Sequence, residues 1–458
     1  MFFYLSIFVR IKNMENENKL GSWPIPKLLI NMSLPMMLSF FIQALYNMVD
    51  SMFVARISED ALTAVSLAFP MQQVANAIAV GVGVGMSALI PRFMGQNEPH
   101  KANQTAHVGI FLNLCATLLF MGFALLFSHS IYTIQTTNTS IIAYGTSYLR
   151  IVWGAGIGVF FCQYFEKMLV CSGNSFYAMI AQASGAIFNI IFDPLLIFGL
   201  GPFPRMGIAG AAIATVLGQI FAAIVGLFFN ISKNDWIHFS LKEICFRKDI
   251  AKDIFAVGIP SMVTIGLASA TSFCVNLIII GYSTTATAVY GIWLKLQNFC
   301  FMPIFGMNNG MIPILSYNQA RKQRGRVVSC ANLAFLYVFI LMFVLTLILE
   351  LFPAPFLQLF SASEHMLEIG IPAIRICVLS LVFAGISLIV SSATQALDYA
   401  RYTLYLNILR QFVVIVSAFY LLSLIFHSVS YLWWALPITE IICCCLSIYL
   451  FRKMLKQI

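Results

Sequence analysis

Charge is scarce in this sequence. Only 9% of the 458 residues are Asp, Glu, Lys or Arg, whereas 60% are hydrophobic. Soluble domains of ordinary composition carry about 25% charged residues. The scarcity excludes a chain of soluble domains, and apolar runs of roughly 18 residues or more, each long enough to cross a bilayer, predict a membrane protein with many spans.

Motifs that hold metals, nucleotides or disulfide frameworks are also missing. The eleven Cys form no C-x-x-C pair and no cluster with His at metal spacing. No Walker motif appears, so ATP is not expected to drive the protein. The spaced glycines at 81–85 and 154–158 follow no strand, and we interpret them as sites of close helix packing. We therefore expect no cofactor and no metalloenzyme.

The N-terminus lacks the pattern of a cleaved signal peptide. FFYLSIF is too short to span a membrane, and no small-residue cleavage site follows it. Met14 opens a more usual polar leader, so either Met1 or Met14 could be the true start. We expect residues 1–27 to form a cytoplasmic leader.

Twelve apolar stretches predict twelve transmembrane helices, because a bilayer offers no hydrogen-bond partners to an open backbone. In the first half they lie at about 29–57, 61–90, 105–130, 139–171, 176–200 and 207–231. In the second half they lie at about 254–280, 286–315, 329–352, 367–396, 402–425 and 429–451. The expected fold is an all-α integral membrane protein.

Basic residues between these spans lie almost entirely on one side of the membrane. The crowded side carries nineteen: Arg10, Lys12, Lys19, Lys27, Arg92, Lys101, Lys233, Lys242, Arg247, Lys248, Lys252, Arg321, Lys322, Arg324, Arg326, Arg401, Arg452, Lys453 and Lys456. The other side carries Arg56 and Arg205. This asymmetry predicts that both termini are cytoplasmic. It also accounts for the net charge of +9 without a nucleic-acid partner.

The two halves of the chain repeat one another at an offset of 225 residues. Pro35 aligns with Pro260, GVGVGM (81–86) aligns with GMNNGM (306–311), and Arg150 of YGTSYLRI aligns with Arg375 of IGIPAIRI. Each half has an even number of helices, so the halves cross the membrane in the same sense, related by a pseudo-twofold axis along its normal. Two such lobes suit alternating access, although a duplicated channel or structural protein would show the same repeat.

The repeat defines the expected domains. We predict a first lobe at 28–231, a cytoplasmic linker at 232–253, a second lobe at 254–451 and a cytoplasmic tail at 452–458.

Several stretches resemble one known family. LPMMLSFFIQALYNMVDSMFVARI (34–57), NIIFDPLLIFG (189–199) and GIAGAAIATV (207–216) are similar to the multidrug and toxic compound extrusion (MATE) family, and the resemblance covers nearly the whole chain from residue 25. It implies twelve helices in two lobes and secondary active export of amphipathic, often cationic compounds in exchange for H⁺ or Na⁺. The expected partners are small molecules and the lipid bilayer, the expected location is the cell (inner) membrane, and a monomer is expected.

Two aspartates lie where a bilayer makes charge costly. Asp50 and Asp193 each precede the outer end of a predicted helix by about seven residues, roughly 10 Å of depth. Asn189 lies one turn before Asp193, and Tyr148 and Thr215 lie at similar levels. Carboxylates with neutral oxygens suit a small hard cation, so Asp50, Asn189, Asp193 and Thr215 are candidate Na⁺ ligands. Two neighbouring carboxyl groups also resist double ionisation, so all five residues are candidates for coupling to H⁺ or Na⁺.

Pro194 follows the second aspartate and is a candidate hinge. Its ring removes a backbone donor, which frees the carbonyl of Ile190 and lets the helix bend. The alternative is a structural role in which Arg150 holds Asp193. At an offset of 225 the second half has Val275 and Ala418 in place of the two aspartates, so cation coupling is expected in the first lobe alone.

Four further charged residues fall inside predicted spans. Glu166, near the cytoplasmic end of its helix, is a candidate contact for a cationic substrate, with pairing to Lys167 or hydration as the alternative. Lys295, near mid-membrane, is expected to face the interior, where it could balance an acid or hold an anionic group. Arg410 and Glu440 lie at similar depths on adjacent helices and are expected to form a structural ion pair.

Two other functions remain open at this point. A flippase of lipid-linked saccharides from the same broad superfamily would usually have more helices and a more cationic cavity. An intramembrane enzyme using Asp50 and Asp193 as an aspartyl dyad is less favoured, because the six His are scattered and show no metal spacing. We expect a transporter and not an enzyme.

Overall fold

The protein is helical, with no strand, throughout the part of the chain that this computed structural model describes, residues 19–360 and 363–456. The choice between Met1 and Met14, and the basic residues Arg10 and Lys12, lie outside the described residues.

The first half of the chain forms one bundle, which we name the first lobe. Its helices are α2 (Lys19–Ser22), α3 (Ile25–Ala55), α4 (Glu59–Gly95), α5 (Pro99–Gln135), α6 (Thr139–Gly154), α7 (Ile157–Cys171), α8 (Ser175–Phe198) and α9 (Ile208–Lys233). The short helix η1 (Leu241–Glu243) lies in the connection to the second half.

The second half forms a matching bundle, the second lobe. Its helices are α10 (Lys248–Ile280), α11 (Thr284–Ala320), α12 (Arg324–Leu351), α13 (Pro353–Gln358), α14 (Glu364–Val378), α15 (Ser380–Ala396), α16 (Ala400–Ile408), the π-helix η2 (Leu409–Val414), α17 (Ile415–Phe426), α18 (Val429–Leu432) and α19 (Ala435–Leu455).

Most of the predicted spans are present as long apolar helices. Among the described residues, ten helices are long and apolar enough to cross a membrane, and α14 with α15 gives an eleventh candidate, bent by 41°. The predicted span at 139–171 is divided into α6 and α7, of 16 and 15 residues. Gly154 ends α6 in open space, with no neighbour within 4 Å, so it does not serve the close packing that we predicted for it.

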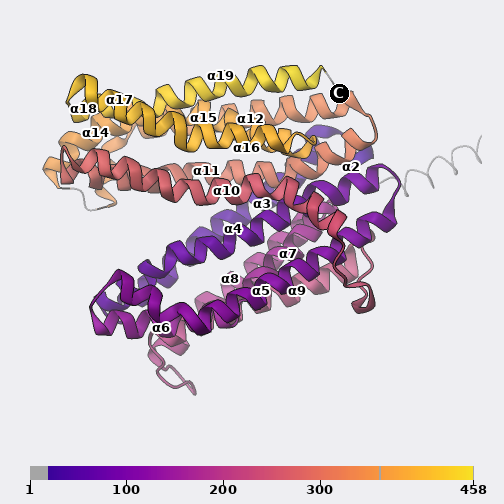
Figure 1. Ribbon diagram of the computed structural model, residues 1–458, viewed down its shortest axis with the longest axis horizontal. Helices are drawn as coiled ribbons and strands as arrows, with labels where there is room; N and C mark the ends of the chain where they lie inside the picture. Colours follow the sequence, from indigo (N-terminus) through magenta and orange to yellow (C-terminus); the bar gives the residue numbers. More distant parts are fainter. Residues whose placement is uncertain (1–18, 361–362, 457–458) are drawn as a thin grey trace, which may run out of the picture.

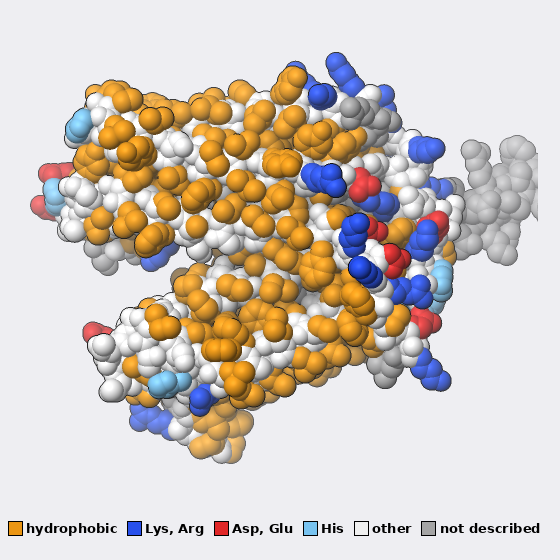
Figure 2. Space-filling model, in the orientation of Figure 1, with side chains coloured by type: hydrophobic (Ala, Val, Ile, Leu, Met, Phe, Trp, Pro, Cys, Tyr) orange, Lys and Arg blue, Asp and Glu red, His pale blue; other side chains and the backbone are white. Residues whose placement is uncertain are grey.

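The two lobes meet at one end and separate toward the other. Figure 1 shows the bundles converging near the C-terminus and diverging away from it. Figure 2 shows an open cleft between them at the far end, hydrophobic side chains over the flanks of both lobes, and Lys and Arg gathered at the closed end. The apolar flanks fit a bilayer, and the basic side chains fit its aqueous surface.

At the closed end, two pairs of helices from different lobes pack closely at equivalent glycines, and we call these two contacts the glycine seams. A Cβ on Gly85 of α4 would overlap the carbonyl oxygen of Ile254 on α10. A Cβ on Gly310 of α11 would overlap the side chain of Ser33 on α3. Because Gly85 and Gly310 are equivalent at the offset of 225, the repeat in the sequence becomes a repeated helix contact between the lobes.

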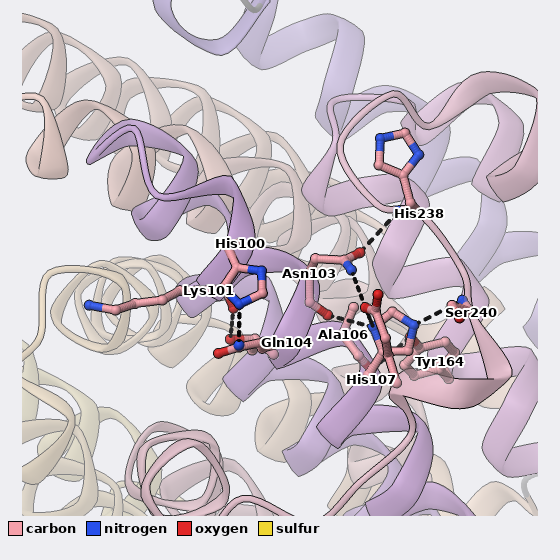
Figure 3. Close-up of polar contacts among 11 residues, drawn as sticks. His100, Lys101, Asn103, Gln104, Ala106, His107, Tyr164, His238 and Ser240 are labelled. Carbon is pink, nitrogen blue, oxygen red and sulfur yellow. Dashed lines mark hydrogen bonds and ion pairs between the residues drawn. The ribbon is translucent and has the colours of Figure 1, made fainter.

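The loop between the lobes is fastened to the start of α5 (Figure 3). Asn103 Oδ1 accepts the backbone N–H of His238 at 3.0 Å, and its Nδ2 donates to Glu243 Oε2 at 2.8 Å. His107 Nε2 accepts the backbone N–H of Ser240 at 3.0 Å. Its Nδ1 therefore carries the hydrogen and donates to the carbonyl oxygen of Asn103 at 2.8 Å. These contacts attach the loop to the first lobe.

Candidate functional site

An aspartate pair from two helices lies inside the first lobe. Asp193 of α8 is fully buried and Asp50 of α3 is half-buried. The two carboxyl groups lie close enough to interact electrostatically. Asn189 donates from Nδ2 to Asp193 Oδ1 at 3.3 Å, and the same nitrogen lies 3.5 Å from Thr215 Oγ1 of α9. The structure thus brings all four candidate Na⁺ ligands together.

Three oxygen atoms of this cluster face no hydrogen-bond donor. Asp50 Oδ1, Asn189 Oδ1 and Asp193 Oδ2 are buried and have no partner within the described part of the chain. Buried acceptors left without donors are costly. A proton shared between the carboxyl groups, or a small cation among the oxygens, would remove that cost. Among the described residues, no group of three His, Cys, Asp or Glu lies together as metal ligands would.

A tyrosine and a glutamine extend the cluster. Tyr148 is buried and interacts electrostatically with Asp50, and its hydroxyl accepts from Gln72 Nε2 of α4 at 3.3 Å. Tyr46, one turn before Asp50 on α3, lies close to both aspartates. Sequence reasoning missed Gln72 and Tyr46. The spacing of four residues from Tyr46 to Asp50 was the signal that could have found the tyrosine.

Two predictions concern the surroundings of Asp193: that Pro194 is a hinge and that Arg150 holds the carboxylate. α8 continues through Pro194 as one helix, and the hinge at Pro194 stays a prediction. The expectation that Arg150 could hold Asp193 is wrong: Arg150 is exposed and donates from Nε to Ser128 Oγ of α5 at 3.1 Å. Its hydrogen-bond partner belongs to α5, whereas Asp193 belongs to α8.

The second lobe has no carboxylate at the equivalent positions. Val275 is fully buried in its apolar core, and Ala418 packs against the same core. The polar cluster therefore belongs to one lobe only.

Glu166 lies at the closed end and does not line the open cleft. It is 6% exposed, and its Oε1 is 3.4 Å from Nζ of Lys167, which is 3% exposed. Lys167 Nζ also donates to Asn309 Oδ1 of α11 at 2.6 Å, across the boundary between the lobes. In this conformation a substrate in the cleft could not reach Glu166 without displacing these contacts.

The remaining candidates lie in the second lobe. Lys295 is exposed, with Nζ 5.5 Å from the centre of the Phe360 ring. Arg410 and Glu440 form a buried ion pair, in which Nε donates to Oε1 at 3.0 Å and to Oε2 at 2.7 Å. Arg410 belongs to the π-helix η2, whose widened turn is accommodated where the hydroxyl of Thr271 donates to the carbonyl of Gln411.

Comparison with known proteins covers both lobes. The MatE family model matches residues 35–195 and 260–451. The chain is 27% identical over 428 residues to the multidrug export protein MepA of Staphylococcus haemolyticus strain JCSC1435, covering 93% of this chain and 92% of that protein. It is 24% identical over 436 residues to MepA of Staphylococcus aureus strain MRSA252, covering 94% and 95%.

Solved structures show the same arrangement of helices. The outward-facing conformation of a multidrug resistance MATE family transporter of the MOP superfamily aligns with a TM-score of 0.89 at 23% identity, over 96% of this chain and 98% of that one. A MOP superfamily transporter from Pyrococcus furiosus aligns with a TM-score of 0.88 at 23% identity, over 96% and 97%. That second protein is described as having a binding pocket of reverse polarity that suggests a different function.

Proposed function

Because this chain belongs to the MatE family of membrane transporters, we propose that it exports amphipathic organic compounds, cationic ones in particular, in exchange for H⁺ or Na⁺. Family membership answers one alternative raised by the sequence: the chain is a transporter and not an aspartyl enzyme. The names of the MepA relatives support multidrug export as the activity.

The observation that carries the coupling proposal is the aspartate pair, of which Asp193 is fully buried and Asp50 half-buried. Asp50 and Asp193 come from α3 and α8, which pack against each other, and with Asn189 they present acceptor oxygens that no side chain satisfies. Binding of H⁺ or Na⁺ would neutralise this site and draw the two helices together. Release would restore repulsion between the carboxylates and favour another packing. α3 also packs closely against α11 at Gly310, so a movement of α3 would be transmitted to the second lobe.

We place the coupling step within alternating access. With the cleft open, the cation enters at the aspartate pair, and α3 and α8, with Pro194 as the hinge, repack to release the compound. Rocking of the lobes then opens the end that is closed here, where the cation leaves and the next compound enters. Exchange requires that cation and compound favour different conformations or exclude one another.

The orientation follows from charge. We place the closed, basic end and both termini in the cytoplasm, in a multi-pass protein of the cell membrane. The open cleft then faces outside. A monomer suffices for this cycle, because both lobes belong to one chain.

The charge of the substrate concerns two residues of opposite sign, Lys295 and Glu166. Lys295 is exposed in the second lobe, whereas Glu166 is buried at the closed end. A cationic compound would meet Glu166 only once that end opens. We therefore propose Glu166 as a contact in the inward-open conformation and Lys295 as a contact for anionic groups.

Transport into and out of proteoliposomes tests the coupling. The full chain is reconstituted, a pH gradient and a Na⁺ gradient are imposed separately, and efflux of a fluorescent cationic dye is followed. We expect Asp193→Asn and Asp50→Asn to reduce driven efflux to the passive leak. Glu368→Gln, at an exposed acid of the second lobe, is the matched control and should leave it unchanged.

A further variant separates the two ions. Asn189→Leu removes a candidate Na⁺ ligand but leaves both carboxyl groups, so it should abolish Na⁺-driven efflux and only weaken H⁺-driven efflux. Undiminished efflux from a folded, monodisperse Asp193→Asn protein under both gradients would refute the coupling role.

A further inference from the structure

A groove of about 580 Å³ opens between α5 and α6, and none of the residues of the aspartate cluster lines it. It is lined by polar and basic side chains as well as apolar ones: His129, Thr139, Ile142, Ala143, Thr146, Ser147, Arg150 and Ile151. α6 packs against α4, α5 and α9 of its own lobe and lies near the open end, away from the second lobe. The groove is therefore on the flank of the first lobe and is no part of the transport cleft.

The positive charge in this groove has no carboxylate partner. Arg150 is exposed, its Nε donates to the neutral Ser128 Oγ, and no acidic side chain in the described part of the chain lies within ion-pair distance of its guanidinium. An arginine facing hydrocarbon without a partner is costly. Its remaining N–H groups are free to bind an anion.

Arg150 lies about as far below the open end as the aspartate pair, and its long side chain extends toward the lipid headgroups at that end. Its partner Ser128 lies seven residues before Gln135, the last residue of α5, which is roughly 10 Å along the helix. Helical side chains lean toward the N-terminus, so Arg150 reaches toward the open end of the lobe. Just below this level, α5 exposes large apolar side chains, Leu118, Leu119, Leu125 and Leu126. A ligand with an anionic group above apolar chains would match this surface, and a phospholipid has that arrangement.

The repeat supplies an internal comparison. Arg375, the residue equivalent to Arg150, has an acid within reach, with Nε 3.8 Å from Glu350 Oε1. At the offset of 225, the place of Glu350 in the first half is taken by Leu125. The second lobe thus supplies Glu350 as the counter-charge of Arg375. The first lobe has no such acid for Arg150 and has a groove beside it.

We propose that this groove binds the phosphodiester headgroup of one anionic phospholipid from the leaflet at the open end. The guanidinium of Arg150 donates to two phosphate oxygens, the geometry at which arginine is most effective. Ser147 and His129 offer further donors, and the acyl chains lie along the apolar face of α5. The phosphate takes the place that Glu350 fills in the second lobe.

Lipid binding by the full chain tests the site. The detergent-purified protein is titrated with dioleoyl phosphatidylglycerol and examined by native mass spectrometry, with thermal unfolding as a second readout. Arg150→Gln should weaken binding about tenfold or more, because it removes a hydrogen-bonded charge pair. Arg375→Gln is the matched control and should bind as the wild type does. Ser147→Leu, which keeps the arginine and fills the groove, should also lose the lipid.

Two related compounds identify which part of the lipid is recognised. Dioleoylglycerol has the acyl chains without the phosphate and should neither bind at this site nor raise the unfolding temperature. Glycerol 3-phosphate has the phosphate without the chains, and an effect equal to that of the lipid would overturn the assignment to a lipid. Equal affinity of Arg150→Gln and wild type, or an equal loss in Arg375→Gln, would overturn the site itself.

Discussion

Lys167 of the first lobe donates a hydrogen bond to Asn309 of the second lobe at 2.6 Å, at the closed end of the cleft. Lys167 is buried, Asn309 is half-buried, and Glu166 balances the charge of the lysine. When the lobes rock, this bond must break, because its two ends belong to different lobes. It is therefore part of the energy that favours the conformation seen here.

Asn309→Leu should shift the molecule toward the conformation in which this end is open. A hydrogen bond to a charged group contributes about 1.5–3 kcal/mol, so the fraction with the closed end open should rise about tenfold or more. Spin labels on the exposed residues Lys101 and Arg401 would report the distance between the lobes by pulsed electron paramagnetic resonance. Asn298→Leu, an exposed asparagine of the same helix, is the control. An unchanged distance distribution in Asn309→Leu would rule out this role.

The glycine seams predict a steric effect that is equal in the two lobes. Gly85→Ala and Gly310→Ala each place a methyl group against the neighbouring helix, which should destabilise this packing by about 1–3 kcal/mol. Gly122→Ala of α5 meets nothing within 4 Å and should be neutral or slightly stabilising, because alanine favours helix over glycine by about 1 kcal/mol. Thermal unfolding in detergent checks the order. If all three variants unfolded at one temperature, the close contacts would have no energetic weight.

Two ion pairs of the second lobe, one buried and one exposed, should differ in cost when one partner is removed. Glu440→Gln leaves Arg410 buried and uncompensated, with an expected loss of about 3–5 kcal/mol. Glu350→Gln affects a pair whose side chains are 54% and 40% exposed, with an expected loss of about 0–1 kcal/mol. The double variant Arg410→Met/Glu440→Leu should recover most of the stability, since no charge is then left buried. Thermal unfolding measures all three, and equal losses for the two single variants would contradict the assignment.

Hydropathy predicted where the chain crosses the membrane but not where its helices break. The divided span at Ala155–Gly156, the bend between α14 and α15, and the π-turn at Arg410 involve one or two residues each. An average over a long apolar window cannot resolve them. Likewise, α4 and α11 run to Gly95 and Ala320, beyond the apolar stretches, because helices continue into water at little cost once their buried part is formed.

The candidate site was predictable where one helix or one depth determined it. The spacing of Asn189 and Asp193, and the similar depths of Asp50 and Asp193, required only helix geometry. The bond from Lys167 to Asn309 joins residues 142 apart in the chain, and nothing local to either residue indicates it. Depth alone also misplaced Arg150, because two side chains at one level can point to opposite sides of a helix bundle.

The attachment of the inter-lobe loop to α5 limits how far the lobes can travel. Asn103 holds Glu243, and α10 begins at Lys248, so five residue steps connect the anchor to the second lobe. Fully extended, this connecting segment spans about 17 Å. A swing that carries the start of α10 further must first peel the loop from Asn103 and His107. The distance that the start of α10 can move away from the first lobe thus depends on the length of residues 243–248. That length could be changed without altering any residue proposed to bind the transported compound.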